Sequence, residues 1–117
     1  MATMEKKLLS GSTQGKGIKL TGNDTAGAIA IHQAVAGTSD IDEIWLYAVN
    51  SSAAAVKLTL EWGEDTVDGN IEVTIDAESG LVLVAPGLLL QNNLTVEAFA
   101  GTTNVINIHG FVNRITA

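Results

Sequence analysis

Side chains able to do chemistry are few in this chain and lie far apart. The two histidines, His32 and His109, each fall within a segment that alternates like a β-strand. A catalytic histidine needs an orienting partner and a nucleophile within reach, and no neighbouring residue supplies either. The sequence has no Gly-x-Ser-x-Gly turn and no cysteine. We therefore interpret both histidines as half-exposed strand residues and predict a protein that is not an enzyme.

An acidic stretch is the second candidate for chemistry. Between two strand-like segments lie Glu64, Asp65, Asp68 and Asn70, whose side-chain oxygens are of the kind that Ca²⁺ prefers. They lack the alternating spacing and the final glutamate of an EF-hand loop. The pattern favours a solvated loop that keeps an apolar chain soluble, with these four residues as the candidate ligands if a metal binds. We predict no metal and no other cofactor.

Aromatic residues offer a third possibility, because aromatic rings beside carboxylates are typical of carbohydrate sites. Trp45 and Tyr47 are two residues apart and share one face of their predicted strand, while Trp62 belongs to the next strand. Cross-strand or core packing explains the same pattern with fewer requirements. A small enzyme that uses loop acids such as Asp68 is the poorest of the hypotheses that we consider.

The segments that must position these residues read as β-strands. Apolar and polar residues alternate, and Gly, Asn, Ser and Asp stand between the alternating runs. The predicted strands cover residues 28–32, 43–49, 56–62, 71–75, 81–84, 94–100 and 105–115. Residues 26–36 also fit a short Ala-rich helix, but Ile29, Ile31 and Val35 fall on one alternating face and favour a strand.

Two local details refine this prediction. The runs 43–49 and 56–62, with Asn50-Ser51-Ser52 between them, predict a β-hairpin whose second strand buries Val56, Leu58, Leu60 and Trp62 and exposes Lys57, Thr59 and Glu61. Gly110, in the middle of the last run, predicts a bulge. Many short strands without a long helix predict an all-β fold, an antiparallel β-sandwich that is either jelly-roll-like or Ig-like.

Composition narrows the class of partner. The chain has 117 residues and a net charge of −7, which disfavours both nucleic acid and an anionic membrane surface. Hydrophobic residues make up 46% and charged residues only 16%, below the roughly one-quarter usual in a soluble domain. Such a surface suggests that another protein or another copy of the chain covers part of it.

The first 17 residues differ from the rest, because they are rich in Gly and Ser and carry Lys6, Lys7 and Lys16. We predict a flexible or extended N-terminal arm over residues 1–17 and a β-sandwich domain over residues 18–117. The candidate protein-interaction residues in the arm are Lys6, Lys7, Leu8, Leu9 and Lys16. The short apolar run at Leu8 and Leu9 does not fit a signal peptide, so we expect synthesis in a cytoplasm.

Several stretches resemble the small virion structural proteins of tailed bacteriophages: residues 42–52, 56–63, 79–90 and 107–115. The resemblance implies a capsid decoration or cement protein on the exterior of the phage head, made in the host cytoplasm. It also implies that the major capsid protein is the partner and that the chain forms a homo-oligomer, with a trimer favoured. The alternative is a carbohydrate- or receptor-binding β-sandwich module of a phage fibre or tail.

Overall fold

The structure is a computed structural model that describes residues 2–117. Strands account for 53% of the chain and helix for 5%, which confirms the predicted all-β class. The described elements are the strands β1 (Thr3–Lys7), β2 (Ile18–Lys19), β3 (Ile29–Gln33), β4 (Ile41–Asn50), β5 (Val56–Trp62), β6 (Asn70–Ile75), β7 (Val82–Leu90), β8 (Thr95–Ala100) and β9 (Ile106–Thr116), with the 3₁₀ turns η1 (Thr25–Gly27) and η2 (Val67–Gly69).

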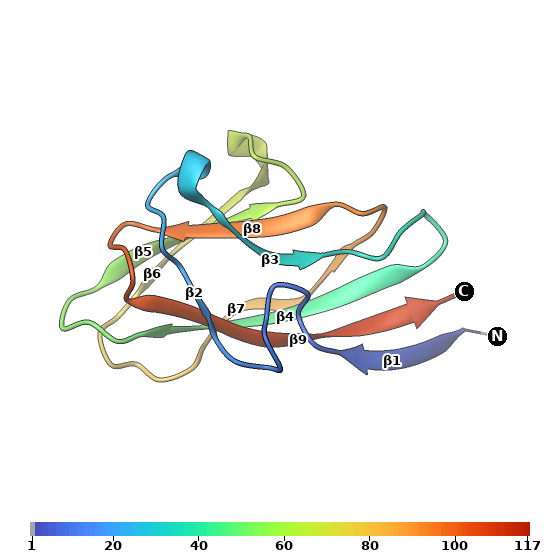
Figure 1. The fold of residues 1–117 in the computed structure, drawn as a ribbon, viewed down its shortest axis with the longest axis horizontal. Coiled ribbons are helices and arrows are strands. Elements are labelled where there is room, and N and C mark those ends of the chain that lie inside the picture. The colour runs from blue at the N-terminus through green and yellow to red at the C-terminus, as the bar shows by residue number, and fades with distance from the viewer. Residues whose placement is uncertain (1) are drawn as a thin grey trace.

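The strands form two antiparallel sheets packed face to face (Figure 1). Sheet I has the order β1-β9-β4-β7, and β2 pairs with β9 beyond the end of β1. Sheet II has the order β3-β8-β5-β6. The pairs β5–β6, β4–β7, β3–β8 and β2–β9 are nested like one long hairpin that has been folded into two layers. This nesting defines a jelly roll and decides between the two sandwich types that the sequence left open.

The predicted hairpin of residues 43–49 and 56–62 is wrong. Both segments are strands, but β4 lies in sheet I and β5 in sheet II, so the chain crosses between the sheets at residues 51–55. The physical reason is that the intervening turn carries the chain over the edge of the core instead of reversing it within one sheet. Alternation along a strand reports which face is buried, and it carries no information about which strand is the neighbour.

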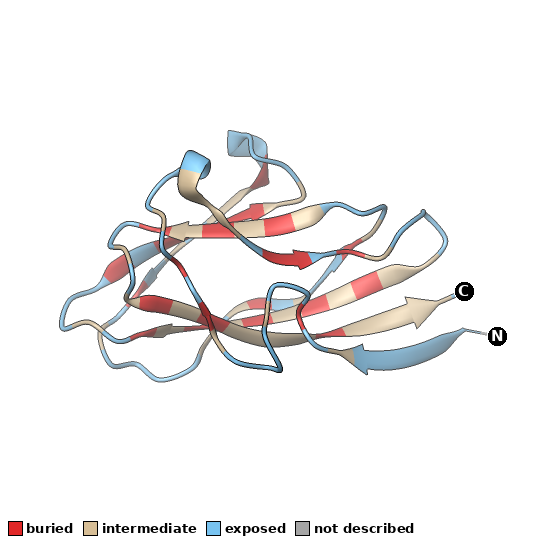
Figure 2. Ribbon diagram, in the orientation of Figure 1, coloured by how far each residue is buried: buried red, intermediate tan, exposed pale blue. Residues whose placement is uncertain are grey.

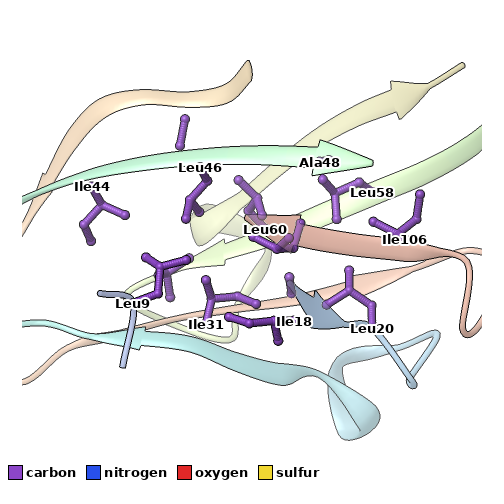
Figure 3. Close-up of a cluster of buried hydrophobic side chains, with 14 of the residues drawn as sticks. Leu9, Ile18, Leu20, Ile31, Ile44, Leu46, Ala48, Leu58, Leu60 and Ile106 are labelled. Carbon is purple, nitrogen blue, oxygen red and sulfur yellow. The ribbon is translucent and has the colours of Figure 1, made fainter. Parts of the chain in front are cut away.

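The core lies between the sheets and consists of aliphatic side chains (Figures 2 and 3). Alternate residues of β4 point inward, among them Ile44, Leu46 and Ala48, and they meet Leu58 and Leu60 of β5. All five are fully buried, so replacing Leu58 by Ala is expected to cost about 2–5 kcal/mol of stability.

Two predicted details of the strands are corrected by the structure. The strand predicted over residues 81–84 does not end there, because β7 continues through Pro86 and Gly87 to Leu90 with two shifts of register against β4. Gly110 does not mark a bulge, since β9 stays in continuous register with β4 on both sides of it. Gly110 is instead a point of close approach, where an added Cβ would overlap the carbonyl oxygen of Trp45.

The N-terminal segment was predicted to be either flexible or extended. In the structure it is extended, and it is part of the sandwich. β1 is an edge strand of sheet I, with Met4 opposite Ile115. Farther on, the backbone N–H of Gly11 donates to the carbonyl of Ile31 at 2.9 Å, and Leu9 is buried in the core. Residues on both sides of the boundary predicted at residue 18 therefore pack in the same sandwich.

Candidate functional site

A buried polar network joins the two sheets at His32 and Asp42. His32 lies on β3 and Asp42 on the inner side of β4, and neither is more than 2% exposed. His32 Nε2 and Asp42 Oδ2 are 2.8 Å apart. Arg114 of β9 donates to both carboxylate oxygens, from Nε to Oδ1 at 2.8 Å and from a terminal nitrogen to Oδ2 at 3.0 Å. The backbone N–H of Val35 adds a further bond to Oδ2 at 3.1 Å.

The charges in this network favour an ionised carboxylate. Burial raises the pKa of the Asp42 carboxyl, but hydrogen bonds from Arg114 and His32 and the positive charge of Arg114 outweigh burial. The net result is a pKa below the ordinary value for aspartate. The hydrogen bond to Asp42 likewise raises the pKa of the Arg114 guanidinium against the opposing effect of burial. Asp42 is therefore a satisfied buried anion.

The geometry of the network leaves His32 no nitrogen for catalysis. Its Nδ1 accepts a hydrogen bond from the backbone N–H of Ser10 at 2.9 Å, so Nε2 carries the proton and donates it to Asp42. The prediction that His32 is half exposed is wrong, because β3 shifts register after Ala30 and turns the ring inward. Through Ser10, the network ties the N-terminal segment to both sheets. His109 is partly exposed, as predicted.

The outward side of sheet I carries the protein's second unusual feature, which we name the aromatic face. Its apolar members come from β1, β4, β7 and β9. The alternation along each strand and the register between strands place their side chains on this side of the sheet. They are Met4, Ile41, Trp45, Tyr47, Val49, Leu83, Pro86, Leu89, Phe111 and Ile115.

A stacked pair of rings lies at the centre of the aromatic face. Trp45 and Phe111 are opposite each other on β4 and β9, with ring centroids 6.1 Å apart and planes inclined by 11°. The ammonium group of Lys6 lies 4.7 Å from the centroid of the Phe111 ring, close enough for a cation–π interaction. The sequence analysis correctly placed Trp45 and Tyr47 on one face. It missed Phe111, which is 66 residues beyond Trp45 and becomes its neighbour only through the β4–β9 pairing.

Polar contacts fix the Trp45 ring in place. The indole Nε1–H donates to Glu43 Oε1 at 2.8 Å, and Asn113 Nδ2 donates to the same oxygen at 2.9 Å. These two hydrogen bonds lower the pKa of the Glu43 carboxyl, while burial opposes them only weakly. Gly87 has a positive φ of 76° and lies against the ring, since an added Cβ would come within 3.0 Å of it. The centre of the aromatic face is thus preorganised.

Around this centre the aromatic face exposes large apolar side chains. Met4 is 65% exposed, Leu89 55% and Leu83 47%. Aromatic residues and Met are enriched at protein–protein interfaces, whose centres are poor in charge. The arrangement suits a protein surface that is itself apolar.

The predicted interaction residues of the N-terminal segment are not gathered at one place. Lys6 reaches the aromatic face, whereas Lys7 pairs with Glu5 at 2.5 Å. Leu8 and Lys16 are exposed. The prediction that Leu9 contacts a partner is wrong. Its side chain is 2% exposed and lies in the core, so a partner cannot reach it.

The candidate metal ligands are also dispersed. Glu64, Asp65 and Asp68 are exposed on the loop around η2, where Glu64 accepts a hydrogen bond from Thr66. Asn70 begins β6 and is partly buried. Among residues 2–117, no three His, Cys, Asp or Glu side chains gather closely enough to hold a metal ion. This part of the chain also contains no pocket and no helix that is long and apolar enough to cross a membrane.

Comparisons of the chain with protein-family models, with curated proteins and with solved structures each find no match.

Proposed function

We propose that this chain is a non-enzymatic virion structural protein, a capsid decoration or cement protein that binds between capsomers and stabilises a phage head. The observation that carries the proposal is the aromatic face, where exposed apolar side chains surround the stacked rings of Trp45 and Phe111. An exposed apolar sheet face of this kind is typical of a surface that another protein covers. The occupant that we infer is the major capsid protein of the assembled lattice.

Two further observations support the proposal. The jelly roll recurs in viral capsid domains, although by analogy only, because a fold does not fix a function. The sandwich is also rigidly tied together, since Asp42 joins β3, β4 and β9. A rigid domain that binds only the intact lattice stabilises the lattice by linkage, and many symmetric copies multiply a modest contact. The proposed oligomer is a homotrimer on the head exterior.

Carbohydrate binding by a fibre or tail module is the second candidate, because jelly rolls also occur in lectin domains and Tyr47 lies on the outward side of sheet I. The packing of Trp45 weakens this candidate. Its ring is already engaged by Phe111 and Gly87, which occupy the contacts that a sugar ring would use.

The test is co-sedimentation of the protein with purified capsids of the virus that encodes it, stripped of their own copies. Tyr47 and Leu83 are opposite each other on β4 and β7, and neither belongs to the core. We expect the double variant Tyr47→Ser/Leu83→Ser to keep its circular dichroism spectrum and to lose about tenfold or more in affinity, equivalent to about 1.4 kcal/mol.

The matched control is Val67→Ser, which also replaces an exposed apolar residue but lies on η2, away from the aromatic face. We expect this control to bind capsids as the wild type does. Equal binding by the double variant and the wild type would contradict the proposed docking surface. Binding to a glycan array that the double variant loses, without any capsid binding, would favour the fibre or tail module.

A further inference from the structure

A second carboxylate, Glu61, is buried without the partners that Asp42 has. It lies on β5, the strand of sheet II between β8 and β6, and is 1% exposed. Its chain neighbours Leu60 and Trp62 point toward the other sheet, so the Glu61 side chain points away from the main core. Burying a carboxylate is costly unless hydrogen bonds or an opposite charge compensate it.

The compensation of Glu61 is incomplete. Thr25 of η1 donates from its hydroxyl to Glu61 Oε2 at 2.9 Å. The other oxygen, Oε1, is buried and has no hydrogen-bond partner. Among the described residues, the basic side chains that form ion pairs do so with Glu5, Asp42 and Glu72, and none of them pairs with Glu61.

The neighbouring strands place two more oxygen-bearing side chains beside Glu61. Asn70 of β6 is directly opposite it on one side, and Glu97 of β8 is directly opposite it on the other. Residues opposite each other in a sheet point to the same face, with Cβ atoms about 5 Å apart. Asn70 Oδ1 is also buried without a partner. Two like charges and two unmatched acceptor oxygens therefore meet in one row, an arrangement that is unfavourable by itself.

A short turn covers this row from outside. The η1 turn is closed by the N–H of Gly27 donating to the Asp24 side chain at 2.9 Å, and the N–H of Ala100 donates to the carbonyl of Gly22 at 3.2 Å. These bonds hold the turn against β8, on the side of sheet II away from sheet I (Figure 1). The position of Thr25 above Glu61 is thereby fixed.

We propose that Glu61, Glu97 and Asn70 bind a divalent cation of the calcium class beneath the η1 turn. Ca²⁺ accepts carboxylate and amide oxygens in irregular geometry and completes its shell with water. It would occupy the unmatched sides of Glu61 and Asn70 and separate the two glutamate charges. A site with only two carboxylates is expected to bind with a Kd of about 10⁻⁴–10⁻³ M.

Isothermal titration of the metal-free full chain with CaCl₂ tests the proposal, with a thermal melt at each concentration as a second readout. The wild type is expected to bind one ion, and its melting temperature should rise with calcium concentration because the ion binds only the folded state. We expect Glu61→Gln to lower the affinity about tenfold or more. If Glu61→Gln does not fold, Glu97→Gln, at a less buried position, serves in its place.

The matched control is the double variant Asp65→Asn/Asp68→Asn, which removes two carboxylates from the exposed η2 loop nearby. Its affinity should stay within about twofold of the wild type. Absence of any binding heat or shift in melting temperature in the wild type up to about 10 mM CaCl₂ would overturn the proposal. In that case the amide nitrogen of Asn70 would be the group that donates a hydrogen bond to Glu61 Oε1. Binding that the control loses and Glu61→Gln keeps would also overturn the proposal.

Discussion

The two outward sides of this sandwich differ sharply in chemistry. The aromatic face of sheet I is built around Trp45, Phe111 and exposed leucines. The outward side of sheet II, which we name the acidic face, is mainly polar and includes Lys57, Thr59, Glu61, Asn70, Glu72, Thr74, Glu97 and Phe99. Because both sheets share one core, the difference cannot come from the needs of folding.

The fold and the surface use alternate residues of each strand. On β4 the inward residues are Ile44, Leu46 and Ala48, and the outward ones include Trp45 and Tyr47. Large rings on the outward side are not needed to close the core. We therefore infer that the aromatic face binds another protein. On the acidic face, we infer that a bound cation compensates the carboxylate charges.

The most damaging change to the aromatic face is predicted to be Gly110→Ala. The added Cβ would overlap the carbonyl oxygen of Trp45 and push β9 away from β4 beneath the stacked rings. We expect a loss of about 4 kcal/mol or more in the free energy of unfolding, measured by urea denaturation. The control is Gly101→Ala, where the nearest atom to an added Cβ is 3.8 Å away. Equal stability of the two variants would show that the close approach is not tight.

The next largest loss in the free energy of unfolding is expected for Asp42→Asn, on the inner side of the same sheet. This change removes the anion between Arg114 and His32 and leaves the guanidinium without its partner. Breaking a buried ion pair from one side costs about 3–5 kcal/mol, and urea denaturation at neutral pH should show a loss of this size. Asp68→Asn, on the exposed η2 loop, is the control and should leave stability unchanged. A loss below about 1 kcal/mol would contradict the role given to Asp42.

Lowering the pH should weaken the same network in the wild-type protein, and the loss should appear as a lower free energy of unfolding. The pKa of Asp42 is lower in the folded protein than in an unfolded chain, where it is about 3.9. Its contribution is therefore fully present above about pH 4 and is lost as the pH falls through the folded pKa. Urea midpoints measured from neutral pH downward should fall in acid for the wild type. A parallel curve for Asp42→Asn would contradict this assignment.

The smallest effect is predicted for an exposed pair on the acidic face. Lys57 forms an ion pair with Glu72, and both side chains are at least half exposed. Lys57→Gln should change stability by less than about 1 kcal/mol, because exposed ion pairs contribute little. The adjacent Leu58→Ala, on the buried side of the same strand, should cost about 2–5 kcal/mol in the same urea assay. Similar losses for both variants would show that the two sides of β5 are assigned wrongly.

How far the sequence predicts the structure depends on whether a feature is local. Alternation correctly predicted the strands at residues 56–62, 94–100 and 105–115, because each strand's own pattern records its buried side. It predicted Thr59 and Glu61 to be exposed, and this was wrong, since both are at most 2% exposed. The cover over Glu61 is the η1 turn, more than 30 residues earlier in the chain, and strand periodicity holds no trace of it.

The candidate sites were harder to predict because pairing brings them together from a distance. His32 meets Asp42 across the two sheets, and Asp42 meets Arg114 from 72 residues away. The sequence pattern contained the hint of an isolated aspartate on the buried side of an apolar strand, and a buried charge requires a partner. The identity of that partner follows only from the nested strand order of the jelly roll.

We propose that this chain is a structural component of a virion. The most direct test is its copy number in purified virions, measured by quantitative mass spectrometry against the major capsid protein. We expect a ratio close to that of the capsid subunit, as for a protein spread over the whole lattice. Absence of the chain from purified virions would contradict this proposal.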